Sequence, residues 1–370
     1  MTQSLTLGVE EEFFAVDPIS RELLTDGRPI LDLLHRRSAG DHDPSYSHEL
    51  RLCMVESRTG ICHGLDQVRS EIRRLRAGLI QAAAETGSAV AAAGTLPLAH
   101  WETQCITPNP RYEHMANAFA RMASEHVICA CHVHVGIDDR ELAVQVLNRA
   151  RPWMPVLLAL STSSPFWMGK ETGYASYRSI VWERWPMAGM PPLFHSYPDY
   201  KARVDSLIGT RMIFDAGQVF WDVRLGTKHE TLEFRIADSC TTIDETIMQA
   251  GLCRALVQVC LNEVAEGNHS PDIRPELLRA AKWRSARFGL DDCLLDPVSA
   301  EVLPAARVLE RLMAYLRRGL EEAGDWDEVG WLVEQTKRAG TSAQRQRRVF
   351  VETQRLENVV DLLVQETGLG

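Results

Sequence analysis

The chain has 370 residues, of which 45% are hydrophobic and 24% charged, and its formal net charge is −10. This balance is typical of a globular protein in water. The acidic charge argues against a nucleic-acid-binding surface, and the longest apolar run is too short to cross a membrane. Nine cysteines without a disulfide framework, and an N-terminus without a signal-peptide pattern, predict a cytoplasmic protein. No linker or repeat divides the chain, so we expect one domain over residues 1–370.

The chain up to residue 160 alternates between strand-like and helical segments. Apolar patterning predicts strands at 5–16, 90–94 and 129–135. Helical spacing predicts helices at 66–85, 110–127 and 138–160. Asp66 is the expected N-cap of the first helix, and Pro152 and Pro155 are expected to break or kink the third.

Residues 161–198 are rich in proline, glycine, tryptophan and tyrosine. An irregular segment of this length is typical of a functional loop. A strand pair is predicted next, at 219–225 and 231–237. The part from about 245 to 370 is predicted to be helical, with helices at 245–263, 275–287, 304–323, 326–337 and 345–365. Two alternatives stay open for these helices: packing within the chain, or pairing two subunits as a homodimer.

Three short segments, far apart in the sequence, place ionisable side chains on one face of a predicted strand. Residues two apart in a strand point the same way. The pairs that share a face are Glu10 and Glu12, His132 and His134, and Glu233 and Arg235. Their opposite faces are mostly apolar. The pattern predicts an α+β protein whose sheet packs one face on a core and lines a pocket with the other, and the pocket's chemistry suits Mg²⁺ and ATP.

Each pair also has a simpler explanation. Glu10 and Glu12 could be solvated, but strands are depleted in glutamate and these two have apolar neighbours, so cation binding is favoured. A lone histidine is more often a core residue than a ligand, whereas two on one face favour a ligand role. Zinc held with Cys129 and Cys131 is disfavoured, because these cysteines face away from the histidines. We expect both cysteines in the core.

The remaining candidates are weaker. Glu233 and Arg235 fit either an ordinary ion pair or a metal ligand beside a phosphate-binding arginine. Glu49 and Glu56, seven residues apart, cannot share a face of one straight strand and converge only through a bend or from two elements. For Arg178 and Lys228 the default is solvated surface charge, and Arg178 stands out by its place in the irregular segment. No Gly-rich phosphate loop is present, so ATP would be held by the sheet and its metal ions.

The chain resembles the type 2 glutamate–cysteine ligase family of carboxylate–amine ligases, in motifs that follow one another over nearly its whole length. The matching motifs are Gly8-Val9-Glu10-Glu11-Glu12-Phe13 with Val16-Asp17-Pro18, His132-Val133-His134-Val135-Gly136, Leu158-Ala159-Leu160-Ser161, Ser164-Pro165-Phe166-Trp167, Thr172-Gly173, Ser176-Tyr177-Arg178, Trp221-Asp222-Val223-Arg224, Thr231-Leu232-Glu233-Phe234-Arg235 and Ala343-Gln344-Arg345.

This resemblance implies a glutamine-synthetase-like fold, in which an antiparallel sheet forms an open funnel backed by helices. The cofactors it implies are ATP and Mg²⁺, with Mn²⁺ as an alternative. The implied metal ligands are Glu10, Glu12, Glu49, Glu56, His132 and Glu233. Arg235 and Lys228 are the expected phosphate contacts, and Arg235 and Arg178 the expected catalytic cations. His134 is either a ligand or a neighbour of the ligands.

The implied reaction joins a carboxylate to an amine through an acyl phosphate, with L-glutamate and L-cysteine giving γ-glutamylcysteine as the reference case. The chain departs from the family pattern at Phe220-Trp221-Asp222 and around Lys228, and these departures concern substrate choice. Three alternatives stay open: a ligase for another acid and amine, phosphoryl transfer to a nitrogen, and a nucleotide sensor on the same fold.

Overall fold

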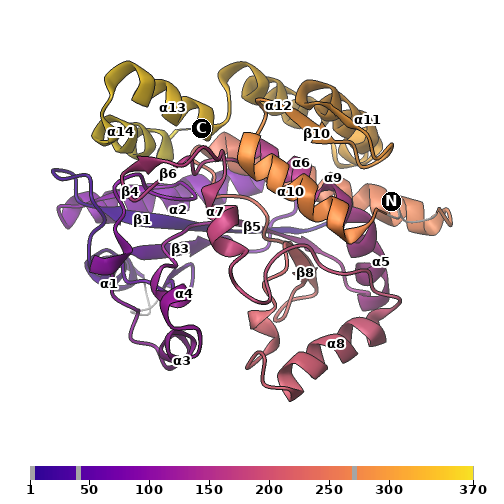
Figure 1. Cartoon of the computed structure of the whole chain (residues 1–370), viewed down its shortest axis with the longest axis horizontal. Coiled ribbons are helices and arrows are strands. Elements are labelled where there is room, and N and C mark those ends of the chain that lie inside the picture. The colour runs from indigo at the N-terminus through magenta and orange to yellow at the C-terminus, as the bar shows by residue number, and fades with distance from the viewer. Residues whose placement is uncertain (1–4, 39–42, 269–272, 370) are drawn as a thin grey trace.

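The computed structural model describes residues 5–38, 43–268 and 273–369. Its centre is a seven-stranded antiparallel sheet (Figure 1). The strand order is β2 (Tyr46–His48), β3 (Met54–Arg58), β1 (Leu7–Val16), β5 (Cys131–Gly136), β9 (Thr231–Phe234) and β8 (Val223–Leu225), and β4 (Ala89–Ala91) pairs with β1. Two small hairpins, β6 (Phe166–Trp167) with β7 (Lys170–Glu171) and β10 (Cys293–Leu295) with β11 (Val302–Pro304), lie outside this sheet.

The helices surround the sheet. They are α1 (Arg28–Arg37), α2 (Leu65–Glu85), α3 (Pro110–Phe119), α4 (Arg121–Ser124), α5 (Arg140–Ala150), α6 (Met154–Leu160), α7 (Tyr177–Trp182), α8 (Tyr197–Gly209), α9 (Ile243–Ala265), α10 (Pro275–Phe288), α11 (Ala305–Ala323), α12 (Trp326–Ala339), α13 (Ser342–Thr353) and α14 (Leu356–Thr367). Figure 1 shows α11 to α14 along one side of the molecule and α3 and α8 on the opposite side. In the described part of the chain, no helix is long and apolar enough to cross a membrane.

The two faces of the sheet differ because side chains alternate along each strand. Val9, Val133 and Leu232 are buried, and they belong to one hydrophobic core with residues of α2, α5, α6 and α9. Helix α9 is buried along most of its length, as expected for a helix that is apolar on all sides. A capping box of Thr242 and Glu245 fixes its start. This packing leaves the other face of the sheet free to carry polar groups.

The strand register brings the polar side chains into rows across that second face. In one row Glu10 is paired with Arg58 of β3 and with His132 of β5. In the next, Glu12 is opposite Glu56. A third row contains His134, Glu233 and Arg224. The alternation read from the sequence therefore becomes a patch of charge spread over five neighbouring strands.

The predicted elements exist, with differences at their ends. The break expected near Pro152 is confirmed as a 3₁₀ turn over Arg151–Trp153. The N-cap expected at Asp66 is wrong: Gly64 holds that position and Asp66 lies in the first turn, where its charge favours the helix dipole.

Two predicted helices are each split by a residue with positive φ, an unfavourable conformation for L-amino acids inside a helix. Ala120 (φ 48°) separates α3 from α4, and Gln354 (φ 55°) separates α13 from α14. The segment 161–198 is not wholly irregular, since it contains the β6–β7 hairpin, α7 and the start of α8.

Candidate active site

A cavity of about 620 Å³ opens on the polar face of the sheet. It is lined from the sheet, from α3 and α7, and from the turn between β8 and β9. All the site residues predicted from the sequence line it: Glu10, Glu12, Glu49, Glu56, His132, Glu233, Arg178, Lys228 and Arg235. The structure therefore brings together side chains from segments more than 200 residues apart.

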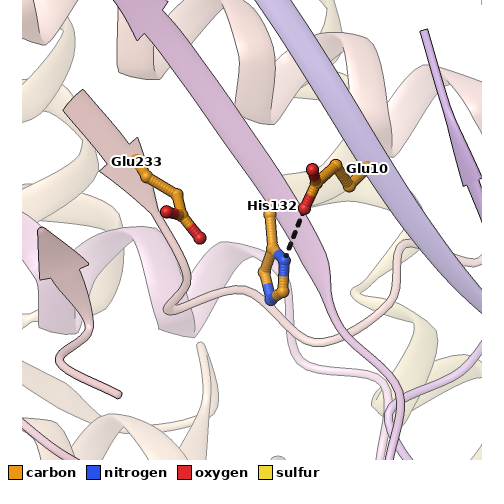
Figure 2. Close-up of side chains that lie close together, drawn as sticks. All are labelled: Glu10, His132 and Glu233. Atoms are coloured by element: carbon orange, nitrogen blue, oxygen red, sulfur yellow. Dashed lines mark hydrogen bonds and ion pairs between the residues drawn. The ribbon is translucent and has the colours of Figure 1, made fainter. Parts of the chain in front are cut away.

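Glu10, His132 and Glu233 form the tightest group. Each offers one ligand atom, and these atoms lie within 4.8 Å of one another. Figure 2 shows the three side chains converging from neighbouring strands, with His132 Nδ1 3.3 Å from Glu10 Oε2. His134 Nε2 is 3.5 Å from the other oxygen of Glu10. Burial disfavours the charge on Glu10, but its contacts with His132 and His134 outweigh burial and hold its pKa well below the usual range.

A second group is formed by Glu12, Glu49 and Glu56. Glu56 belongs to β3, whereas Glu49 follows β2, so of the two possibilities left open, a bend or two elements, the structure shows the second. Burial and the charge of Glu56 raise the pKa of Glu12 to about 7. Burial and the neighbouring carboxylates raise the pKa of Glu49 well above its usual value. Such mutual repulsion marks a place where a cation would be strongly attracted.

Glu233 is held by two arginines. Arg224 Nε and Nη2 donate to its two carboxylate oxygens at 2.8 and 3.0 Å, and Arg235 Nη1 also donates to it. Burial raises the pKa of Glu233, but Arg235 and Arg224 together hold it well below the usual range. Glu233 and Arg235 therefore form an ion pair, which is compatible with both roles considered for them. Sequence reasoning missed Arg224, although alternation along β8 places it on the polar face.

Arg178 and Lys228 are placed differently from one another. Arg178 is buried, and its Nη2 and Nη1 donate to the backbone carbonyls of Arg235 and Ile236 at 3.0 and 3.2 Å. Asp238 lies 3.7 Å from Arg178 Nη1. Arg178 therefore fixes the backbone that carries Arg235, while Lys228 is exposed at the rim of the cavity.

Beneath the site, Glu11 points into the core. Arg76 Nη2 and Nε donate to its carboxylate at 2.6 and 3.1 Å, and both side chains are at most 1% exposed. Arg76 also donates to the carbonyls of Cys240, Thr241 and Thr367. The sequence does contain a signal for this pair. Glu11 lies between Glu10 and Glu12 in a strand, so its side chain must face the core, where a buried carboxylate needs a cationic partner.

One end of the cavity is aromatic. Trp182 and Trp185 lie with their ring centroids 5.1 and 5.5 Å from that of Phe220. Trp185 Nε1 donates to His126 Nδ1 at 3.1 Å. Burial lowers the pKa of His126 to about 3, so this end carries a neutral imidazole at physiological pH. The cysteines set aside earlier, Cys129 and Cys131, are in the core as expected.

The antiparallel sheet with helices packed around it is a glutamine-synthetase-like fold, of the kind found in glutamate–cysteine ligases. A crystal structure of glutamate–cysteine ligase from Francisella tularensis in complex with AMP superimposes with a TM-score of 0.73, at 11% identity, over 99% of this chain and 89% of that one. The fold class implied by the resemblance is therefore confirmed.

A family model described as glutamate–cysteine ligase family 2 matches residues 6–365, and the chain belongs to this family. A relative in Rhodopirellula baltica, named "Putative glutamate--cysteine ligase 2", is 39% identical over 98% of this chain and 96% of its own length. A relative in Frankia casuarinae, named "Putative glutamate--cysteine ligase 2-2", is 41% identical over 98% of this chain. The match covers 41% of that longer protein, so this chain spans less than half of it.

Proposed function

We propose that this protein is an ATP-dependent ligase that joins a carboxylate to an amine through an acyl phosphate. The observation that carries the proposal is a convergence of acidic, imidazole and guanidinium side chains in one cavity: Glu10, Glu12, Glu49, Glu56, His132 and Glu233 with Arg178 and Arg235. Membership of the family gives the class of reaction. The reference substrates are L-glutamate and L-cysteine, and the cysteine content suggests that the reaction takes place in the cytoplasm.

The donor set suits magnesium. Carboxylate oxygens are the preferred ligands of Mg²⁺, and Glu10, His132 and Glu233 already have ligand atoms within 4.8 Å of one another. Glu12, Glu49 and Glu56 form a second acidic group with raised pKa values, which a cation would relieve. Bound there, Mg²⁺ would neutralise phosphate charge and hold the reacting oxygens in place.

The chemistry requires activation of the acid. A carboxylate is a poor electrophile because its leaving group would be oxide. In the proposed reaction a carboxylate oxygen takes the γ-phosphoryl group of ATP and ADP leaves. The amine nitrogen then attacks the carbonyl carbon and loses a proton, and phosphate departs. Arg235 offsets negative charge on the phosphoryl oxygens, Arg178 holds the Arg235 backbone in position, and Lys228 attracts the nucleotide at the rim.

The test is ADP release with Mg²⁺ and ATP over a panel of acids, with and without amines, combined with mass spectrometry of the products. ADP together with γ-glutamylcysteine identifies the reference reaction, and ADP with another amide identifies a specialised ligase. ADP that depends on a nitrogen acceptor but yields no amide points to phosphoryl transfer. ATP binding without ADP release for any pair refutes the proposal and favours a sensor.

Arg235→Ala should lower kcat roughly 100-fold and leave KM for the acid within about threefold, because the arginine acts on charge that develops during transfer. Arg307→Ala, which changes an exposed residue of α11, is the control and should behave as the wild type. Steady-state kinetics with the substrate pair found above gives both constants. A rise in KM with unchanged kcat would contradict this role for Arg235.

A further inference from the structure

One part of the cavity has an apolar wall. Six side chains that line the cavity form its wall, and none is more than 9% exposed: Leu50, Met115, Ile128, Trp182, Trp185 and Phe220. They belong to one hydrophobic cluster, distinct from the large core behind the sheet. We call these six residues the aromatic compartment. His126, whose ring contacts those of Trp182 and Trp185, stays neutral because burial lowers its pKa to about 3.

The compartment lies at the opposite end of the cavity from the rim that carries Lys228. Residues Ile128, Ala130, His132 and His134 succeed one another along the chain that leads into β5 and through it. Glu12 of the second carboxylate group accepts a hydrogen bond from the Ala130 N–H. Ile128, which belongs to the compartment, therefore lies beyond Glu12 when the row is followed away from His134. The turn with Lys228 precedes β9, whose first residue pairs with Gly136 at the far end of β5. The charged floor therefore lies between the rim with Lys228 and the apolar wall.

One feature favours a ligand site over ordinary core packing. The Trp182 ring lines the cavity and lies 5.6 Å from the guanidinium carbon of Arg235. The apolar wall therefore reaches directly to the arginine that we propose acts on the reacting phosphoryl group.

We infer that the aromatic compartment binds an apolar ring on one of the two organic substrates, so that the enzyme prefers a ring-bearing acid or amine to small polar substrates such as glutamate and cysteine. The inference rests on the proposed function for the position of the reacting groups at Glu10, Glu233 and Arg235. The nucleotide is assigned to the other end, beside Lys228, the proposed phosphate contact at the rim. Stacking against Trp185 and Phe220 would hold the substrate ring.

The first experiment is calorimetric titration of the full chain with Mg²⁺ and four probes: 2-phenylethylamine, 3-phenylpropionate, ethylamine and propionate. Burying a phenyl ring should tighten binding roughly 10- to 100-fold over the matching ethyl compound. A preference seen in the amine pair assigns the ring to the acceptor, and one seen in the acid pair assigns it to the donor. The phenyl probe should bind equally in the presence of ATP, whereas displacement by ATP would overturn the inference.

Substitutions in the wall provide the second experiment. Phe220→Ala should weaken binding of the preferred phenyl probe about tenfold and leave its ethyl analogue unchanged. Met115→Phe, which fills the compartment without opening a cavity, should have the same effect and covers the case in which Phe220→Ala fails to fold. Trp331→Phe alters a tryptophan that is 54% exposed on α12 and should bind as the wild type. Equal binding of phenyl and ethyl probes, or a preference that persists in folded wall variants, overturns the inference.

These results separate the inference from the proposed function. A phenyl preference that disappears in the wall variants supports the compartment even if no substrate pair releases ADP. Ligation of glutamate to cysteine at full rate, with no gain from ring-bearing analogues, keeps the ligase and overturns the compartment.

Discussion

Glu10→Gln should lower the rate of ligation roughly 100- to 1,000-fold without lowering the melting temperature. The substitution keeps the size of the side chain but removes one charge from the group with His132 and Glu233, so the group attracts a cation less strongly. Stability should hold because the Glu10 side chain is 28% exposed and, among the described residues, its ion-pair contacts are with His132 and His134 rather than with an arginine or lysine. ADP release and differential scanning calorimetry, measured on the same preparation, check both parts.

Glu352→Gln is the matched control, because Glu352 is exposed on α13, and it should change neither quantity. Near-normal turnover in Glu10→Gln would remove this residue from the metal ligands. Glu233→Gln is a less clear test, since Glu233 is the carboxylate partner of Arg224 and Arg235. Loss of activity in that variant would combine loss of a ligand with disturbance of two buried cations.

Arg76→Met should lower the free energy of unfolding by about 3–5 kcal/mol, because it leaves Glu11 as an unpaired buried charge. It also deprives the carbonyls of Cys240, Thr241 and Thr367 of their donor. Urea denaturation followed by circular dichroism measures the change, with the slope compared between variants.

The same helix supplies a control. Arg74 has a side chain that is 52% exposed and pairs only with Glu71 among the described residues, so Arg74→Met should change stability by less than about 1 kcal/mol. Adding Glu11→Leu to Arg76→Met should recover part of the lost stability, since an apolar pair of similar size needs no charge compensation. Equal, small effects of Arg74→Met and Arg76→Met would show that the buried pair contributes little.

Much of the sheet and its polar face could be predicted because strand periodicity is local. Two positions are enough to predict that Glu10 and Glu12, or His132 and His134, share a face, because side chains two residues apart in a strand point the same way. What the sequence could not provide was the partner of each charge. Arg224 and Arg76 are two of many arginines in the chain. The register of β8 on β9 brings Arg224 to Glu233, and the packing of α2 under β1 brings Arg76 to Glu11.

The aromatic compartment illustrates the same limit. Trp182 and Trp185 lie in the tryptophan-rich segment 161–198, and Phe220 lies where the chain departs from the family pattern, but Leu50, Met115 and Ile128 come from other parts of the chain. Their meeting depends on long-range packing, which composition does not encode locally. The helices predicted at 110–127 and 345–365 were wrong in being continuous. Each is interrupted by one residue with positive φ, Ala120 or Gln354, and the sequence pattern does not indicate this conformation.

The contacts of Arg76 also bear on the order in which the protein folds. Its hydrogen bond to the Thr367 carbonyl joins positions 291 residues apart, and the loop that this contact closes contains most of the chain. During synthesis the strand with Glu10 and Glu12 emerges before the other strands of the sheet, but its buried neighbour Glu11 has its complete cationic anchor only after residues 240, 241 and 367 have arrived. Contacts of such long range slow folding. The floor of the site should therefore become rigid only long after its strand β1 has been synthesised.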